Sequence, residues 1–233
     1  MEDIASRGER DTRVPQRRLS TARSFWLPLT LGGLAFLGAV WLFGAVAEAV
    51  VHGDALTLDT RIAQWFHQRA IPGFTLAMLV ITQVHSLLGI SVVAAILACF
   101  LIGKRDWYWL LVLVLAVPGG MLLNVLLKNV FQRVRPSFSD PILVLTSYSF
   151  PSGHVVASTV FYGVLCAYLV LKFDAWRWRA LVVLLAFVMV ALVALSRVYL
   201  GVHYLSDVLA GFAEGVVWLA ICFMALQFLP RRH

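Results

Sequence analysis

The stretch Trp107–Leu127, WYWLLVLVLAVPGGMLLNVLL, carries no charge and is close to the roughly 20 residues that a helix needs to cross a bilayer. Uncharged runs of similar character lie on both sides of it, at 24–47, 70–103, 155–171, 180–196 and 215–230. The shorter runs are near the lower limit for a span. The sequence therefore predicts an all-α, polytopic membrane protein with six transmembrane helices in residues 24–230.

The run at 70–103 is longer than one span requires, and Gln83, His85 and Ser86 interrupt its apolar character. We count it as one span, formed either by a long tilted helix or by a helix with a lead-in segment. Before the first run, residues 1–23 are polar and rich in arginine, without apolar periodicity. They predict a disordered tail.

The composition fits a membrane protein, because 61% of the 233 residues are hydrophobic and only 13% are charged. The net charge of +7 could indicate a nucleic-acid partner, but its distribution argues against one. Positive residues gather in the tail, in the turns near 104 and 172–179, and at 231–232. With six spans these segments share one side, which the positive-inside rule makes cytoplasmic. We therefore expect a multi-pass protein of a bacterial-type cytoplasmic (inner) membrane, with both termini cytoplasmic.

Between the first two spans, apolar residues recur at helical spacing at Leu58, Ile62, Trp65 and Phe66. Polar residues, among them Asp59, lie between them, which predicts a short amphipathic helix in the outer membrane interface. This helix is either a connector, the interpretation that periodicity favours, or a wall of a lipid entrance.

Three polar segments at the outer ends of different spans carry the chemically potent side chains. The first, Ser196–Asp207, reads SRVYLGVHYLSD. A helix that starts near His203 would place His203 and Asp207 one turn apart on one face, where the carboxylate can orient the imidazole. Arg197 would precede this helix across a turn near Gly201.

The second segment, Lys128–Pro136, reads KNVFQRVRP. Lys128 and Arg135 are seven residues apart, so a continued helix would place both on one face before Pro136 forces the chain out. Arg133 by itself is readily explained as a cation that extends to the membrane interface.

The third segment, Ser149–Ser158, reads SFPSGHVVAS and predicts a helix start with Ser152 as its cap. A helix N-terminus presents free backbone N–H groups to an anion, and Gly153 permits a close approach. His154 lies beside the same position. Taken alone, this segment is equally well explained as a simple helix cap.

Together the segments offer three cations, two histidines and one carboxylate. His154, His203 and Asp207 could also be metal ligands, yet Lys128, Arg135 and Arg197 would repel a divalent cation and attract an anion. We therefore expect phosphate chemistry without a metal or other cofactor.

The three segments, in this order, resemble the signature of the type 2 phosphatidic acid phosphatase (PAP2) family, which is related to the vanadium haloperoxidases. The resemblance implies that His203 attacks phosphorus to give a phosphohistidine, that Asp207 orients it, and that His154 serves as acid and then base. It also implies that Lys128, Arg135, Ser152, Gly153 and Arg197 hold the phosphate oxygens.

The family implies a lipid phosphatase acting on undecaprenyl diphosphate, phosphatidylglycerophosphate or phosphatidate, and the six-span topology predicts that its site lies on the outer face. Two alternatives stay open: a phosphotransferase that uses the same site, and a non-catalytic protein that binds or transports lipid phosphates. A homodimer also stays open. Glu214 lies outside the signature, about two turns beyond Asp207, and we expect it to serve packing or hydrogen bonding.

Overall fold

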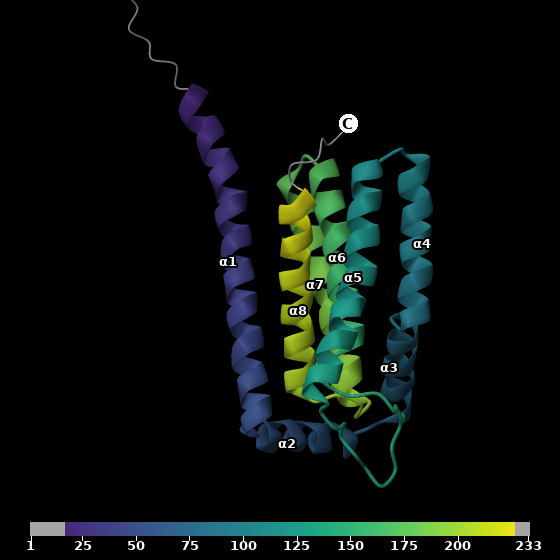
Figure 1. The fold of residues 1–233 in the computed structure, drawn as a ribbon. Coiled ribbons are helices and arrows are strands. Elements are labelled where there is room, and N and C mark those ends of the chain that lie inside the picture. The colour runs from purple at the N-terminus through teal and green to yellow at the C-terminus, as the bar shows by residue number, and fades with distance from the viewer. Residues whose placement is uncertain (1–16, 227–233) are drawn as a thin grey trace, which may run out of the picture. The chain divides into compact units, whose positions relative to one another are not determined.

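The computed structural model describes residues 17–226 and confirms the predicted all-α fold. The described part of the chain forms eight helices (Figure 1): α1 (Arg17–His52), α2 (Leu56–His67), α3 (Pro72–Val84), α4 (Leu87–Gly103), α5 (Trp107–Phe131), α6 (Gly153–Lys172), α7 (Trp176–Tyr199) and α8 (Leu205–Leu226). The chain divides into two compact units, one ending at Ala35 and the other beginning at Phe36. All of the packing below lies within the second unit.

The start of α1 differs from the sequence prediction. The helix begins at Arg17, so residues 17–23 of the predicted disordered tail are helical. Arginine, leucine and alanine in this stretch favour helix over coil. Residues 1–16 of the tail, and both predicted cytoplasmic termini, lie outside the described residues.

The predicted six spans correspond to five long apolar helices and one bent pair. Gly32–His52 within α1, together with α5, α6, α7 and α8, are long and apolar enough to cross a membrane. The pair α3 and α4 meets the same criterion together but bends by 56°. The bend falls at Ser86, whose hydroxyl caps α4 by accepting a hydrogen bond from the Gly89 N–H at 3.2 Å. The long run at 70–103 is therefore two helices that meet at a bend, the geometry of a broken span or a re-entrant loop, and not one tilted helix.

Helix α6 occupies the centre of the bundle and packs against α5, α7 and α8. Small residues at the contacts allow this close approach. Close packing matters in a membrane because lipid provides little hydrophobic force to hold helices together. Gly119 and Gly120 of α5 lie against the Trp218 ring, and Gly215 of α8 lies against Thr159. The Pro118-Gly119-Gly120 triplet thus marks a close helix contact.

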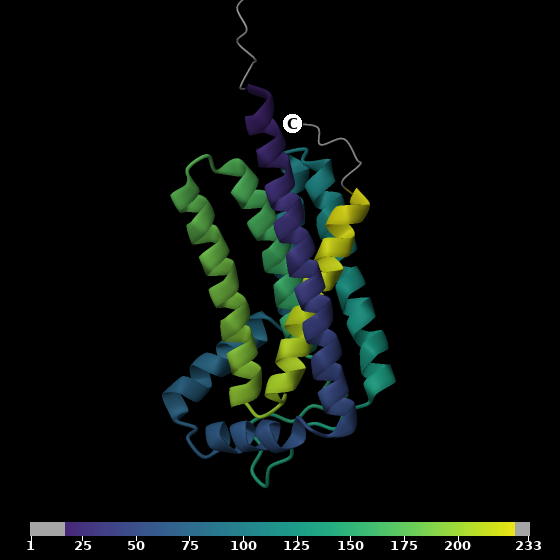
Figure 2. The ribbon, with the colours of Figure 1, turned by 90° about the vertical axis from the view of Figure 1, so that its left-hand side faces the viewer.

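The polar segments and the basic turns lie at opposite ends of the bundle (Figures 1 and 2). At one end, α2 crosses beneath the ends of α7 and α8, near the segment 132–152 and the turn between α7 and α8. At the other end lie the turn after α4, which carries Lys104 and Arg105, and the end of α6, whose last residue is Lys172.

Candidate active site

The structure brings the three predicted segments together at one end of the bundle. Arg135 and Asp207 both contact His203, and the Ser152 N–H donates to the Asp207 carbonyl at 3.0 Å. The remaining predicted residues lie at the adjoining helix ends: Lys128 near the end of α5, Gly153 and His154 at the start of α6, and Arg197 near the end of α7.

His203 lies in the turn between α7 and α8 and is 1% exposed. Helix α8 begins at Leu205, two residues after His203 and close to the predicted start. Gly201, with φ of +67°, provides the left-handed turn that ends α7 and returns the chain to the site. The predicted pairing forms, since His203 Nδ1 lies 3.3 Å from Asp207 Oδ2.

The two ring nitrogens of His203 have different partners. With Nδ1 donating to Asp207, Nε2 retains its lone pair and accepts a hydrogen bond from Arg135 Nη1 at 3.1 Å. Burial and the nearby cations Arg197, Arg135 and Lys128 lower the pKa of His203 well below its ordinary value. The imidazole is therefore neutral at pH 7, with Nε2 available as a nucleophile.

Arg135 reaches His203 from an extended segment and not from a helix. Helix α5 ends at Phe131, and Gln132 adopts a left-handed conformation with φ of 47°. The predicted continuous helix through Lys128 and Arg135 was therefore wrong: the chain turns away before Pro136. Arg135 is fixed by the carbonyls of Ser147 and Val202, at 2.6 Å and 2.5 Å. Burial lowers the pKa of Arg135, although Asp207 opposes the shift.

Lys128 and Arg197 supply positive charge from two other sides. Lys128 Nζ donates to the carbonyls of Tyr148 and Ser149, at 2.5 Å and 3.4 Å. Arg197 is 1% exposed and donates through Nη1 to the Thr82 hydroxyl. Within residues 17–226, its Nε and Nη2 atoms have no hydrogen-bond partner. A buried guanidinium with free donors is costly, and an anion would satisfy it.

Ser152 is the N-cap residue of α6, as predicted, but its hydroxyl caps nothing. The Oγ atom is buried and, among the described residues, has no partner. It is thus a second free donor beside the positive end of α6. His154 follows on the first turn of this helix and lies within electrostatic range of Arg197, His203 and Arg135.

Two residues of the site were missed by sequence reasoning. Arg133, interpreted as an interfacial cation, donates to Asp207 Oδ1 at 2.6 Å and to Asp59 Oδ2 at 2.8 Å. Asp59, placed among the polar residues of the amphipathic helix, is 2% exposed and faces the site. Burial by itself would lower the pKa of Arg133, but Asp207 and Asp59 outweigh it and raise the pKa.

Glu214 lies deeper in the bundle and makes a buried hydrogen bond, as expected. Its Oε2 atom accepts from Asn124 Nδ2 at 3.0 Å, and the same amide nitrogen lies 3.3 Å from the Pro151 carbonyl. Glu214 thereby ties α8 to α5 and to the segment before α6. Across the described residues, no three His, Cys, Asp or Glu side chains form a group that could hold a metal ion.

Comparisons with known proteins agree with this geometry. Phosphatidylglycerophosphatase B of Bacillus subtilis is 34% identical over 183 residues, which covers 77% of this chain and 89% of that protein. Undecaprenyl-diphosphatase of Sulfolobus acidocaldarius is 35% identical over 136 residues, covering 56% of this chain and 60% of that protein. The crystal structure of a transmembrane PAP2-type phosphatidylglycerolphosphate phosphatase from Bacillus subtilis superposes with a TM-score of 0.78 at 28% identity. It covers 86% of this chain and 100% of the solved chain.

The family model of the PAP2 superfamily matches residues 107–231, which contain all three polar segments. The match extends over the four helices α5 to α8 that position them. The predicted resemblance is therefore confirmed, and the chain belongs to the PAP2 superfamily.

Proposed function

We propose that this protein is an integral membrane lipid phosphatase that hydrolyses a lipid phosphate or diphosphate through a phosphohistidine at His203. The observation that carries the proposal is the buried Arg197, whose free Nε and Nη2 donors accompany a neutral histidine whose Nε2 lone pair faces Arg135. The names of the relatives suggest phosphatidylglycerophosphate or undecaprenyl diphosphate as substrates, and phosphatidate remains a third candidate.

In the first step, His203 Nε2 attacks phosphorus, and the bond from phosphorus to the leaving oxygen breaks. His154 gives its proton to that oxygen, so the lipid leaves as an alcohol or, from a diphosphate, as a monophosphate. Arg197, Arg135 and Lys128 bind the remaining phosphoryl oxygens, assisted by the Ser152 hydroxyl and the Gly153 N–H. Asp207 stabilises the positive charge that develops on His203.

In the second step, the same groups work in reverse. His154, now neutral, takes a proton from water while the water oxygen attacks phosphorus. The bond to His203 Nε2 breaks, and its electron pair returns to the ring. Phosphate departs, and both histidines regain their starting protonation states.

An apolar cavity beside the site supports a lipid substrate. It has a volume of about 480 Å³ and lies among α1, α2, α7 and α8, with Val155 and Val208 in its wall. These two valines directly follow His154 and Asp207 in the chain. A hydrocarbon chain in this cavity would place its phosphate at the polar end of the bundle.

We also place the site on the outer face of a cytoplasmic membrane, with both chain termini inside. The support is the separation of charge along the bundle: the basic turns at Lys104 and Lys172 lie at the end opposite the site. Positive turns favour the cytoplasmic side.

The decisive experiment measures phosphate release by purified protein from the three candidate lipids, with and without a chelator. The His203→Ala variant should lose activity by at least about a thousandfold, whereas a matched variant of an exposed histidine, His52→Ala, should not. Acid quenching should trap labelled phosphate on the wild type but not on His203→Ala.

Other outcomes would overturn parts of the proposal. Activity that survives in His203→Ala would refute the nucleophile assignment, and loss of activity with chelator would favour the metal alternative. Phosphate transfer only to an added alcohol would indicate a phosphotransferase. Lipid binding without phosphate release would indicate a binding or transport protein.

A further inference from the structure

The amphipathic helix α2 buries a carboxylate that its sequence pattern assigns to the polar surface. Asp59 is 2% exposed, and its oxygens accept hydrogen bonds from the Ser206 N–H at 3.1 Å, from the Ser206 hydroxyl and from Arg133 Nη2 at 2.8 Å. A charge buried to this extent is costly unless it is paired. Ser206 lies in the first turn of α8, next to Asp207, and Arg133 reaches the same place from the segment after α5.

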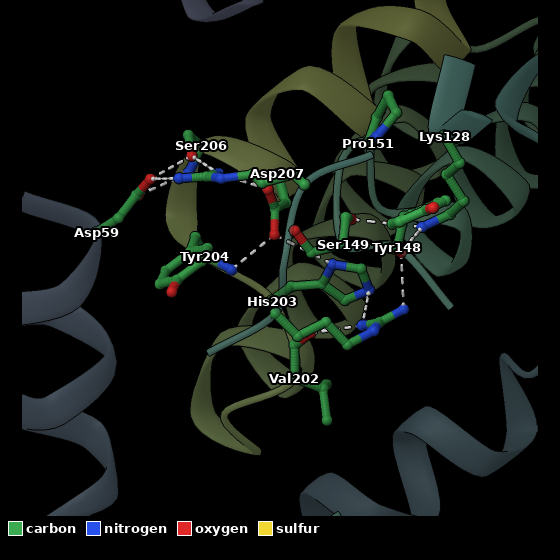
Figure 3. A network of polar contacts seen from close by, with 12 residues as sticks. Asp59, Lys128, Tyr148, Ser149, Pro151, Val202, His203, Tyr204, Ser206 and Asp207 are labelled. Carbon is green, nitrogen blue, oxygen red and sulfur yellow. Dashed lines mark hydrogen bonds and ion pairs between the residues drawn. The ribbon is translucent and has the colours of Figure 1, made fainter. Parts of the chain in front are cut away.

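Arg133 connects this carboxylate to the nucleophile. Its Nη1 atom donates to Asp207 Oδ1 at 2.6 Å and to the Ser206 hydroxyl at 2.6 Å. The Tyr204 ring covers the guanidinium, with 4.4 Å between Cζ and the ring centroid. The second oxygen of Asp207 accepts the Tyr204 N–H at 2.9 Å and faces His203 Nδ1. Figure 3 shows Asp59, Ser206, Asp207 and His203 joined by this network.

The net charge of Asp59, Arg133 and Asp207 favours catalysis by His203. One arginine paired with Asp207 alone would cancel the negative charge that His203 needs as it bonds to phosphorus. Because Arg133 is shared between two carboxylates, the trio keeps a net charge of −1. In a buried site, such a charge stabilises the developing imidazolium strongly.

We propose that Asp59 is a positioning residue that acts through Arg133: it fixes the Asp207 carboxylate and preserves its negative charge for His203. The proposal rests on the proposed function, since it takes His203 as the nucleophile. It makes α2, which lies outside the three signature segments, a working part of the catalytic site.

A purely architectural role for Asp59 is the competing explanation. By accepting the Ser206 N–H, Asp59 could simply anchor the start of α8. Such a role would affect folding and substrate binding and would not depend on Arg133. The two explanations therefore differ in which kinetic constant changes and in whether the effect requires Arg133.

The test uses Asp59→Asn, which keeps an oxygen acceptor for Ser206 but removes the charge. We expect kcat to fall about 10-fold, as for other residues that orient a catalytic group, with KM and the thermal unfolding midpoint little changed. Asp59→Glu should restore much of the rate. The matched control is Asp54→Asn, the same change at an exposed carboxylate just before α2, and it should behave as wild type.

A double-mutant cycle with Arg133→Gln completes the test. If Arg133→Gln does not fold, Arg133→Met, which also removes the charge, replaces it. In the Arg133 variant, Asp59→Asn should change kcat by less than about two-fold, because the connection to Asp207 is already lost. Three results would overturn the proposal. Asp59→Asn could lower kcat equally in the wild type and in the Arg133 variant, it could raise KM in place of lowering kcat, or it could leave kcat unchanged. If His203→Ala retains the wild-type rate, the proposed function itself fails, whatever the cycle shows.

Discussion

At the scale of single residues, the reactivity of the site depends on the two ring nitrogens of His203. Asp207 engages Nδ1, while Arg135 donates to Nε2. The Asp207 carboxylate by itself would favour protonation of the ring. Burial and three neighbouring cations nevertheless lower the pKa of His203. The histidine can therefore be neutral for attack and still be stabilised once it has bonded to phosphorus.

This balance predicts the pH dependence of kcat/KM. The neutral form of His203 is the reactive one, so activity falls as pH drops through its pKa. Because that pKa is lowered, the acid limb should lie below pH 6.5, the ordinary value for histidine. A pH profile of phosphate release under kcat/KM conditions measures the limb directly.

The control for this profile is Arg135→Gln, which removes the cation that faces Nε2. Its residual activity should show an acid limb displaced toward higher pH, since one cause of the lowered pKa is gone. A wild-type limb at or above pH 6.5, or no displacement in the variant, would contradict the assignment to His203.

At the scale of the helices, the site depends on how closely α8 approaches the start of α6. A Cβ atom at Gly211 would lie 2.7 Å from the carbonyl oxygen of Ser152, and backbone cannot move aside. The same contact region includes the hydrogen bond from the Ser152 N–H to Asp207. Any displacement of α8 would therefore move Ser152 relative to His203.

We expect Gly211→Ala to lower both the thermal unfolding midpoint and kcat, with an overpacking cost of about 1–3 kcal/mol. Gly163→Ala is the matched control. The nearest atoms to its Cβ would all belong to the Leu219 side chain, whose Cδ1 at 2.3 Å is a flexible end that can rotate away. Thermal unfolding in detergent and initial rates should separate the two variants. Equal losses in both would show that the Ser152 backbone is not the critical contact.

At the scale of the whole bundle, polar chemistry and basic turns occupy opposite ends. This arrangement predicts the orientation in the membrane. In a variant without the native Cys99, Cys166 and Cys222, Ser139→Cys beside the site should react with an impermeant thiol reagent on intact cells. Asp174→Cys, in the turn between α6 and α7, should react only after the cells are opened. The reverse pattern would invert the proposed topology.

The sequence by itself predicted the membrane-spanning helices and most residues of the candidate site. In lipid, the backbone of a long uncharged segment must satisfy its own hydrogen bonds, and a helix does so. Composition and length alone therefore located the spans. Cations and histidines within such a chain are costly, which made residues such as Arg197 and His203 conspicuous. The amphipathic helix was also predicted, because its apolar residues recur at helical spacing.

Only the tertiary structure decided which charges meet. Periodicity placed Asp59 on a polar face of α2, yet its side chain is buried while Arg61 and Gln64 stay exposed. The partner that pairs with the buried carboxylate, Arg133, comes from a segment 74 residues away. The end of α5 at Phe131, the extended path of Arg135 and the bend between α3 and α4 likewise depend on packing and hydrogen bonds between distant segments. Local sequence specifies which residues share a helix face, but the pairing of buried charges is a property of the assembled bundle.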